Sequence, residues 1–191
     1  MEDLLPPVTK RDVRSALTGL CDRYLIEATG KRFTLQNVIM EFATDRFVER
    51  VGKELERQQF DLFHNHSLIK VTTKDYIRET QVRLILKPVI NCIDNIEQVV
   101  NKSLKTIRKH QDWPNGNIAG SLMNMLCRTQ PKVSYFDFSN LSLRQAYIEG
   151  MQLHKIILAC TSYINSSFTR LFGRIGSVAL QPNGELMATG D

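Results

Sequence analysis

The sequence predicts an α+β protein with a helical N-terminal half, a short coil of β-structure and a terminal β-hairpin. Three patterns predict this class. Apolar residues recur at helical spacing through the first half of the chain. Large apolar residues then recur at every fifth position. The chain closes on an apolar stretch, a Pro-Asn-Gly turn and a second such stretch, which is typical of a hairpin.

Residues 1–58 are expected to form a helix, a short hairpin and a second helix. The first helix has Thr9 as its candidate N-cap, and its apolar face is formed by Val13, Ala16, Leu17, Leu20 and Tyr24. Two short strands surround a turn at Gly30. The second helix is expected to bury Val38, Phe42, Phe47, Val51 and Leu55. Helix, wing, helix is the order at the end of a winged-helix module.

Residues 59–130 are expected to form a helical linker, broken near Pro88 because proline removes a helical hydrogen bond. Its apolar face consists of Leu84, Ile85, Val89, Ile93, Ile96, Val100, Leu104 and Ile107. The sequence DWPNGN at 112–117 is a turn cluster. The short helix that follows carries Leu122, Met125 and Leu126. We expect it to close one end of the next segment by covering Phe138 and Leu143.

Residues 131–170 carry the five-residue spacing. Its members are Phe138, Leu143, Ile148, Leu153, Leu158, Tyr163 and Phe168. On an α-helix a step of five turns by roughly 140°, and on a strand it alternates faces. A chain that turns a corner every five residues can point all seven inward. A second column, two residues earlier each time, is apolar or small: Phe136, Leu141, Ala146, Met151, Ile156, Thr161 and Ser166.

Composition excludes several classes of protein. Hydrophobic residues make up 42% and charged residues 24%, as in ordinary soluble proteins. No apolar run is long enough to span a membrane, and no signal sequence opens the chain. The four cysteines form no C-x-x-C pair, which indicates reduced thiols and a cytoplasmic protein. The net charge of +5 permits an anionic partner without requiring one.

These patterns resemble known families over nearly the whole chain. The five-residue spacing resembles the pentapeptide-repeat family, whose members form a right-handed β-helix. The stretch SVALQPNGELMATGD, within 171–191, resembles the truncated first strands of a WD-repeat propeller. The front half resembles the winged helix that follows the ATPase domain in STAND (NB-ARC type) signalling proteins. RYLIEATGKRFTLQNVIMEFATDRFVE and LFHNHSLIKVTTKDYIRETQVRLILKPV are especially similar to the linker of cyanobacterial ATPase–WD-repeat proteins.

The resemblance implies a non-catalytic segment of a STAND-type protein, lacking its ATPase domain and most of its propeller. No G-x-x-x-x-G-K-[ST] phosphate loop occurs, so no enzyme activity and no cofactor are expected. In the family, a Met-His-Asp motif contacts ADP phosphate. The matching residues here are Leu35, Gln36 and Asn37, so the cation and the carboxylate of the motif are replaced by amides. The expected partner is a protein, such as an NB-ARC ATPase domain or a WD-repeat domain.

The alternative function is a DNA-binding winged-helix regulator. Lys102, Lys105, Arg108 and Lys109 form a basic stretch, but no aromatic residues are interspersed with it, so a solvated helix face is favoured over a nucleic-acid site. No metal site is expected, because the pair His64 and His66 has no third ligand nearby. His154 is placed on the outside of the coil. No catalytic motif is found, and Cys160 is interpreted as a core-edge thiol.

Overall fold

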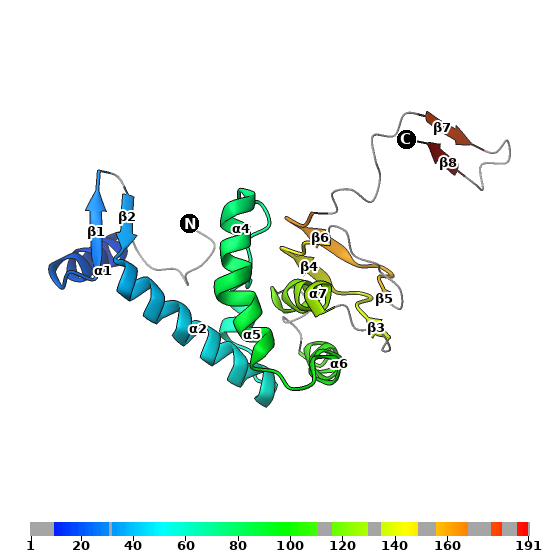
Figure 1. Cartoon of the computed structure of the whole chain (residues 1–191), viewed down its shortest axis with the longest axis horizontal. Coiled ribbons are helices and arrows are strands. Elements are labelled where there is room, and N and C mark those ends of the chain that lie inside the picture. The colour runs from blue at the N-terminus through cyan, green and yellow to red at the C-terminus, as the bar shows by residue number, and fades with distance from the viewer. Residues whose placement is uncertain are drawn as a thin grey trace.

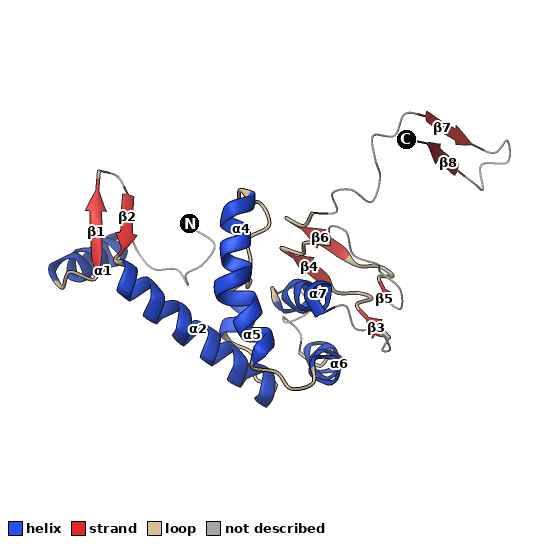
Figure 2. Ribbon diagram, in the orientation of Figure 1, coloured by secondary structure: helices blue, strands red, loops and turns tan. Residues whose placement is uncertain are grey.

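A computed structural model describes residues 10–30, 32–110, 116–129, 135–148, 156–167, 177–180 and 187–190. The fold is α+β, as the sequence predicts. Helices make up most of the N-terminal part, and short strands follow them along the chain (Figure 2).

The first elements are a helix, a hairpin and a long helix, in the expected order. Helix α1 (Lys10–Asp22) is followed by β1 (Ile26–Thr29) and β2 (Arg32–Leu35), which pair antiparallel with Ile26 opposite Leu35. Gly30 has a φ of +61°, a conformation that glycine adopts without steric cost. Helix α2 (Asn37–Arg57) comes next. The proposed N-cap Thr9 lies outside the described residues.

Helix α2 buries only its C-terminal half. Val51 and Leu55 are fully buried, and Phe47 packs partly against the core. Val38 and Phe42, which were expected to be buried, are 73% and 67% exposed, so the prediction was wrong for these two residues. At about 100° per residue, they lie about 140° and 180° around the helix axis from Val51. Val38 and Phe42 therefore lie on a different face of α2 from Val51.

The middle of the chain is helical. Helices α3 (Leu62–Asn65), α6 (Ile96–Ile107) and α7 (Ile118–Thr129) are each separate from the next helix along the chain. Helix α4 (Asp75–Gln81), the π-helical turn η1 (Val82–Leu86) and α5 (Lys87–Asn91) follow one another without a gap. The break expected near Pro88 is therefore absent. The wider π turn, with its i→i+5 bonds, accommodates a residue that lacks an N–H and crowds the preceding turn.

Helix α7 closes one end of the β-coil. Leu122, Met125 and Leu126 are fully buried in the same cluster as Phe138 and Leu143, as expected. A Cβ atom on Gly120 would lie 1.8 Å from the carbonyl oxygen of Arg144, so the helix lies directly against the coil backbone. The Asn124 amide donates to the Gln145 carbonyl (2.8 Å) and accepts from the Tyr147 N–H (2.7 Å).

The coil strands pair in parallel at a constant offset of 20 residues. Strand β3 (Phe136–Asp137) pairs with β5 (Ile156–Ile157), with Phe136 opposite Ile156. Strand β4 (Ser142–Arg144) pairs with β6 (Ser162–Ile164), with Ser142 opposite Ser162. Tyr147 and Ser167 form a further parallel bridge. Each circuit of the chain therefore takes 20 residues, or four steps of five.

The second coil is linked to the first by side-chain hydroxyls. Thr161 Oγ1 donates to the Phe138 carbonyl (3.1 Å), and Ser166 Oγ donates to the Leu143 carbonyl (2.8 Å). Both belong to the second column that the sequence marks as apolar or small. Their polarity is explained by these cross-coil hydrogen bonds, which pair backbone carbonyls in a partly buried place.

One hydrophobic cluster extends from Val48 to Ile148 and joins α2, the middle helices and the first coil. It crosses the expected divisions after residues 58 and 130. Figure 1 shows the same arrangement: α1 and the hairpin lie at one end of α2, whereas the other helices and the coil surround its far end. The core therefore sits at the C-terminal half of α2.

The C-terminal strands form the expected hairpin. Strand β7 (Ser177–Leu180) pairs antiparallel with β8 (Met187–Gly190), with Ser177 opposite Gly190. The Pro-Asn-Gly turn between them lies outside the described residues.

Candidate functional site

The most distinctive surface is apolar and lies at the N-terminal end of the molecule. Within 23 residues of α1, the hairpin and the start of α2, seven large apolar side chains are between 36% and 80% exposed. We call this set the N-terminal apolar face: Leu20, Tyr24, Phe33, Leu35, Val38, Met40 and Phe42. Exposed large side chains gathered in this way mark interaction surfaces.

The local structure explains why these side chains stay exposed. Two helices and a two-stranded hairpin have too few elements to enclose a core. Of the described residues before Val48, only Ile26 is a buried apolar side chain. Met40 points along the same side of α2 as Val51, yet it is 47% exposed because the cluster does not reach the N-terminal half of the helix.

The five-residue column is buried at the capped end and opens toward the other end. Phe138, Leu143 and Ile148 are fully buried. Leu158 packs partly against the core, and Tyr163 is 41% exposed. The remaining two members, Leu153 and Phe168, lie outside the described residues. Desolvation raises the pKa of the Tyr163 hydroxyl, which is consistent with partial burial.

The residues at the Met-His-Asp position lie where β2 ends and α2 begins. Gln36 is the N-cap of α2, with an extended backbone and no side-chain capping bond, and Asn37 is exposed. Leu35 was interpreted as an apolar anchor, but it is 40% exposed and belongs to the N-terminal apolar face. A helix N-terminus can favour an anion, but by itself it does not make a binding site.

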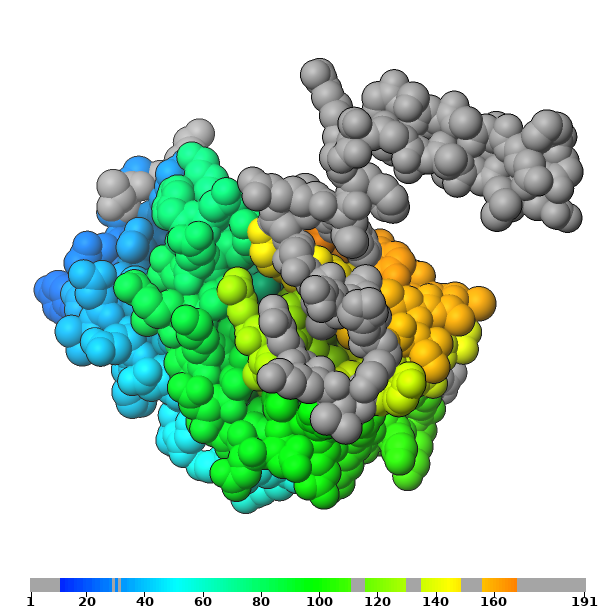
Figure 3. All heavy atoms as spheres, turned by 45° about the vertical axis from the view of Figure 1, so that its right-hand side comes forward, coloured from blue at the N-terminus to red at the C-terminus, as the bar shows by residue number. Residues whose placement is uncertain are grey.

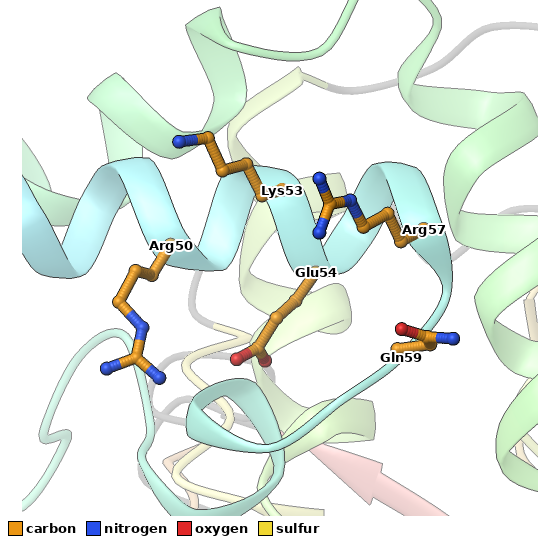
Figure 4. Close-up of a pocket in the computed structure, with 5 residues that line it drawn as sticks. All are labelled: Arg50, Lys53, Glu54, Arg57 and Gln59. Carbon is orange, nitrogen blue, oxygen red and sulfur yellow. The ribbon is translucent and has the colours of Figure 1, made fainter.

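A hollow on α2 is lined by Arg50, Lys53, Glu54, Arg57 and Gln59, and contains about 480 Å³ of space that is largely open to solvent. Figure 4 shows the side chains of Arg50 and Glu54 pointing toward the α3 segment, away from those of Lys53 and Arg57. The Glu54 carboxylate already accepts three N–H groups, from Asp61, Leu62 and Phe63, each at 3.0 Å.

Two of the polar side chains of this hollow, Glu54 and Lys53, therefore have structural partners. Lys53 also donates to Glu49, whose pKa is lowered mainly by that hydrogen bond and by one from Arg46. Glu54 acts as a cap for α3. No pair of carboxylates, and no nucleophile beside a base, is present in this hollow, so its chemistry does not suggest catalysis.

The two histidines of FHNHS have separate surroundings. His64 Nδ1 is buried without a hydrogen-bond partner among the described residues, and it lies close against Gly116. His66 Nδ1 lies 3.3 Å from the Leu62 carbonyl, and its ring meets Phe47 edge-on. In the described part of the chain, no three His, Cys, Asp or Glu side chains are grouped as metal ligands. His154 lies outside the described residues.

The basic stretch of α6 is partly structural. Lys102, Lys105 and Lys109 are exposed. Arg108 instead donates to the carbonyls of Asp137 (2.6 Å) and Ser139 (3.3 Å), which attaches the helix to the coil. Two exposed lysines on α6 and a third just after it are an ordinary solvated surface.

Cys127 does not have the surroundings of a nucleophile. Burial raises the pKa of the Cys127 thiol to about 12, so this thiol stays protonated at neutral pH. Cys160, interpreted from sequence as a core-edge thiol, is exposed and has a positive φ of 54°.

Comparison with known proteins finds a long WD-repeat relative. The chain is 31% identical, over an alignment of 229 residues that includes 99% of its length, to an uncharacterized WD repeat-containing protein of Nostoc sp.. It spans 18% of the length of that relative. No family model matches the chain, and no solved structure matches it. The similarity links this chain to a part of a WD-repeat protein.

No helix among the described residues is both long and apolar enough to cross a membrane.

Proposed function

We propose that this chain is a non-catalytic protein-interaction and signal-relay segment of a STAND-type signalling protein. The observation that carries the proposal is the N-terminal apolar face, which this chain leaves uncovered while its core lies at the other end of α2. A surface of this kind is stable in water when another protein surface covers it. The WD-repeat relative supports the same role.

The order of the elements supports the more specific part of the proposal, that the segment belongs to a STAND-type protein. Helix, hairpin and helix agree with the end of a winged-helix module. The 20-residue offset of the coil agrees with four pentapeptides per turn of a pentapeptide β-helix. This order implies that the longer protein has an ATPase domain before this segment and WD repeats after it.

Helix α2 has the properties of a lever in such a relay. Its 21 residues extend over about 30 Å. The C-terminal end is held by Gln58, whose amide donates to the Leu55 carbonyl (2.6 Å) and to Ser103 Oγ (3.0 Å). The N-terminal end carries exposed Val38 and Phe42. A partner that moves the free end would displace the whole helix relative to the core.

Catalysis is not part of the proposed function. The amides of Gln36 and Asn37 can donate hydrogen bonds, but they cannot supply the charge of a histidinium or a carboxylate. The chain contains no phosphate loop to hold a nucleotide. We therefore propose that it works without a cofactor.

The test is to measure protein binding through the N-terminal apolar face. Association of the purified chain with itself, and with the regions that flank the matched segment in the Nostoc relative, is followed by analytical ultracentrifugation. We expect at least one association, weakened at least tenfold in the variant Val38→Asp/Phe42→Asp, because a partner would then bury unpaired carboxylates. Tyr76→Asp, at another exposed aromatic residue, is the matched control.

Three results would count against this proposal. ATP hydrolysis by the purified chain would make it an enzyme. A duplex-DNA gel shift that weakens steeply with salt, and that is lost when Lys102 and Lys105 are replaced by Glu, would favour the DNA-binding alternative. Binding to protein that is unchanged in the Val38→Asp/Phe42→Asp variant would remove the role of this surface.

A further inference from the structure

The N-terminal apolar face is large enough to form one side of a stable interface. Met40 points away from Val38 and Phe42 around α2, so it is left out of the estimate. Taking about 200 Å² for each large apolar side chain, the exposed fractions of the other six members correspond to about 700 Å². That is close to the area of about 800 Å² that each partner contributes to an interface of standard size.

The part of this face on α2 is acidic. The first nine residues of the helix, 37–45, contain Glu41 and Asp45 but no lysine or arginine. Both carboxylates are exposed, and neither makes an ion pair within the described part of the chain. The next cation, Arg46, is bonded to Glu49 at 2.8 Å. A partner for Val38 and Phe42 would therefore meet negative charge beside the apolar side chains.

Helix α1 has the complementary character. It is amphipathic, with Leu17 and Leu20 on its apolar side. Residues 10–23, which are α1 and the residue after it, carry four cations, Lys10, Arg11, Arg14 and Arg23, against two carboxylates, Asp12 and Asp22, so their net charge is +2. Arg11, Arg14 and Arg23 are exposed and make no ion pair with any other described residue. An amphipathic helix with basic residues beside its apolar stripe is the kind of partner that an acidic, apolar helix surface binds.

The acidic, apolar surface of α2 and a basic, amphipathic helix that could bind it are thus both present on one chain. We propose that the partner on the N-terminal apolar face is a second copy of this chain, with α1 of each copy packed across the N-terminal half of α2 of the other. A two-fold axis forms both contacts at once and closes the assembly at a dimer. In Figure 3 the α1 and hairpin region forms the outer edge of the molecule, away from the coil. This proposal rests on the proposed function and names its partner.

The test exchanges charges between the two helices of the full-length chain. Sedimentation equilibrium should give a dimer of the 21.9 kDa chain. The variants Glu41→Arg/Asp45→Arg and Arg14→Glu/Arg23→Glu should each dimerise at least tenfold more weakly, because each places like charges opposite one another. An equimolar mixture of the two variants should recover a heterodimer of wild-type affinity, because both contacts then again join opposite charges.

One control separates this result from misfolding, and a second separates it from a general effect of net charge. All four substituted residues are exposed, so the far-ultraviolet circular dichroism of each variant should match that of the wild type. Lys102→Glu/Lys105→Glu changes the net charge by the same amount as Arg14→Glu/Arg23→Glu, on another helix, and should leave the dimer intact.

A wild-type chain that stays monomeric at every soluble concentration would overturn the proposal. A dimer that neither charge variant weakens, or a mixture that stays monomeric, would also overturn it. If the monomer instead binds a flanking region of the Nostoc relative through Val38 and Phe42, the second copy is the wrong partner and the proposed function stands. If the chain binds neither a second copy of itself nor a flanking region of the Nostoc relative, both proposals fail.

Discussion

At the residue scale, four backbone positions determine where the coil turns. Asn140, Gln145, Cys160 and Asn165 all have positive φ angles between 51° and 58°. They form two pairs, each 20 residues apart, at equivalent places in successive coils. Asparagine tolerates this left-handed conformation because its side chain can hydrogen-bond locally. Cysteine gains no such compensation, so Cys160 is the least suitable residue of the four.

We predict that Cys160→Asn stabilises the protein. Its counterpart one coil earlier, Asn140, is already asparagine, and Cys160 is exposed, so the new side chain meets no steric obstacle. Relief of the left-handed strain should raise the free energy of unfolding by about 0.5–1 kcal/mol. Urea denaturation measures the change.

The matched control is Cys92→Asn, because Cys92 is also exposed but has a φ of −76°. This variant should leave the free energy of unfolding unchanged within about 0.5 kcal/mol. A gain of the same size in both variants would show that removal of a thiol, and not backbone strain, is responsible.

At the scale of elements, α7 substitutes for a coil of the β-structure. The amide of Asn124 both donates and accepts, at Gln145 and Tyr147, and so pairs backbone groups that an adjacent strand would otherwise pair. Gly120, one helical turn earlier, allows the close approach. Repeat structures need such an end cap, because the first repeat has no neighbour on its outer side.

We predict that Gly120→Ala and Gly19→Ala change stability in opposite directions. A Cβ atom at Gly120 would lie 1.8 Å from the Arg144 carbonyl oxygen, so the helix and the coil must separate, at a cost of about 2–4 kcal/mol. Gly19 lies in α1 with nothing within 4 Å of its Cβ position. There alanine should stabilise by up to about 1 kcal/mol through helix propensity.

Thermal unfolding of the two glycine variants, followed by circular dichroism, tests this pair. Equal melting temperatures for Gly120→Ala and the wild type would mean that α7 does not lie against the coil backbone as closely as described.

At the scale of the whole molecule, one core unites elements that the sequence divides. The cluster from Val48 to Ile148 includes side chains from α2, the middle helices, α7 and the first coil. Partly buried polar contacts also cross between these parts: Arg78 lies over the Tyr147 ring at 4.1 Å, and the Val71 N–H donates to Gln145 Oε1 at 2.7 Å. The helices and the coil should therefore unfold together.

We predict that Leu143→Asp disrupts the helices as well as the coil. Leu143 is fully buried in the shared cluster, and an unpaired carboxylate there is costly. Helical circular dichroism should fall together with the β signal, and the melting temperature should drop by at least 10 °C, which corresponds to several kcal/mol for a domain of this size.

The control is Ile157→Asp, because Ile157 lies in the next coil of the same β-structure but is 49% exposed. It should melt close to the wild type. Retention of full helical signal in Leu143→Asp would show that the helices form a core independent of the coil.

The sequence alone determined those features that depend on local chemistry. The Gly30 turn, the helix–hairpin–helix order and the five-residue step of the coil all follow from residues close together in the chain. The capping role of Leu122 and its neighbours could also be predicted from the sequence. An apolar helix directly precedes the coil, and the first turn of the coil would otherwise expose its apolar interior. Near Pro88 the sequence predicted a break, but the helix continues there through the π turn Val82–Leu86.

The tertiary structure decided which apolar residues are actually covered. Met40 is apolar and lies on the same side of α2 as Val51, yet Met40 is 47% exposed and Val51 is fully buried. Burial requires a neighbouring surface, and only the three-dimensional arrangement shows that the core ends halfway along α2. The candidate interaction surface therefore became visible only in the structure, because a side chain's sequence pattern does not reveal whether anything lies opposite it.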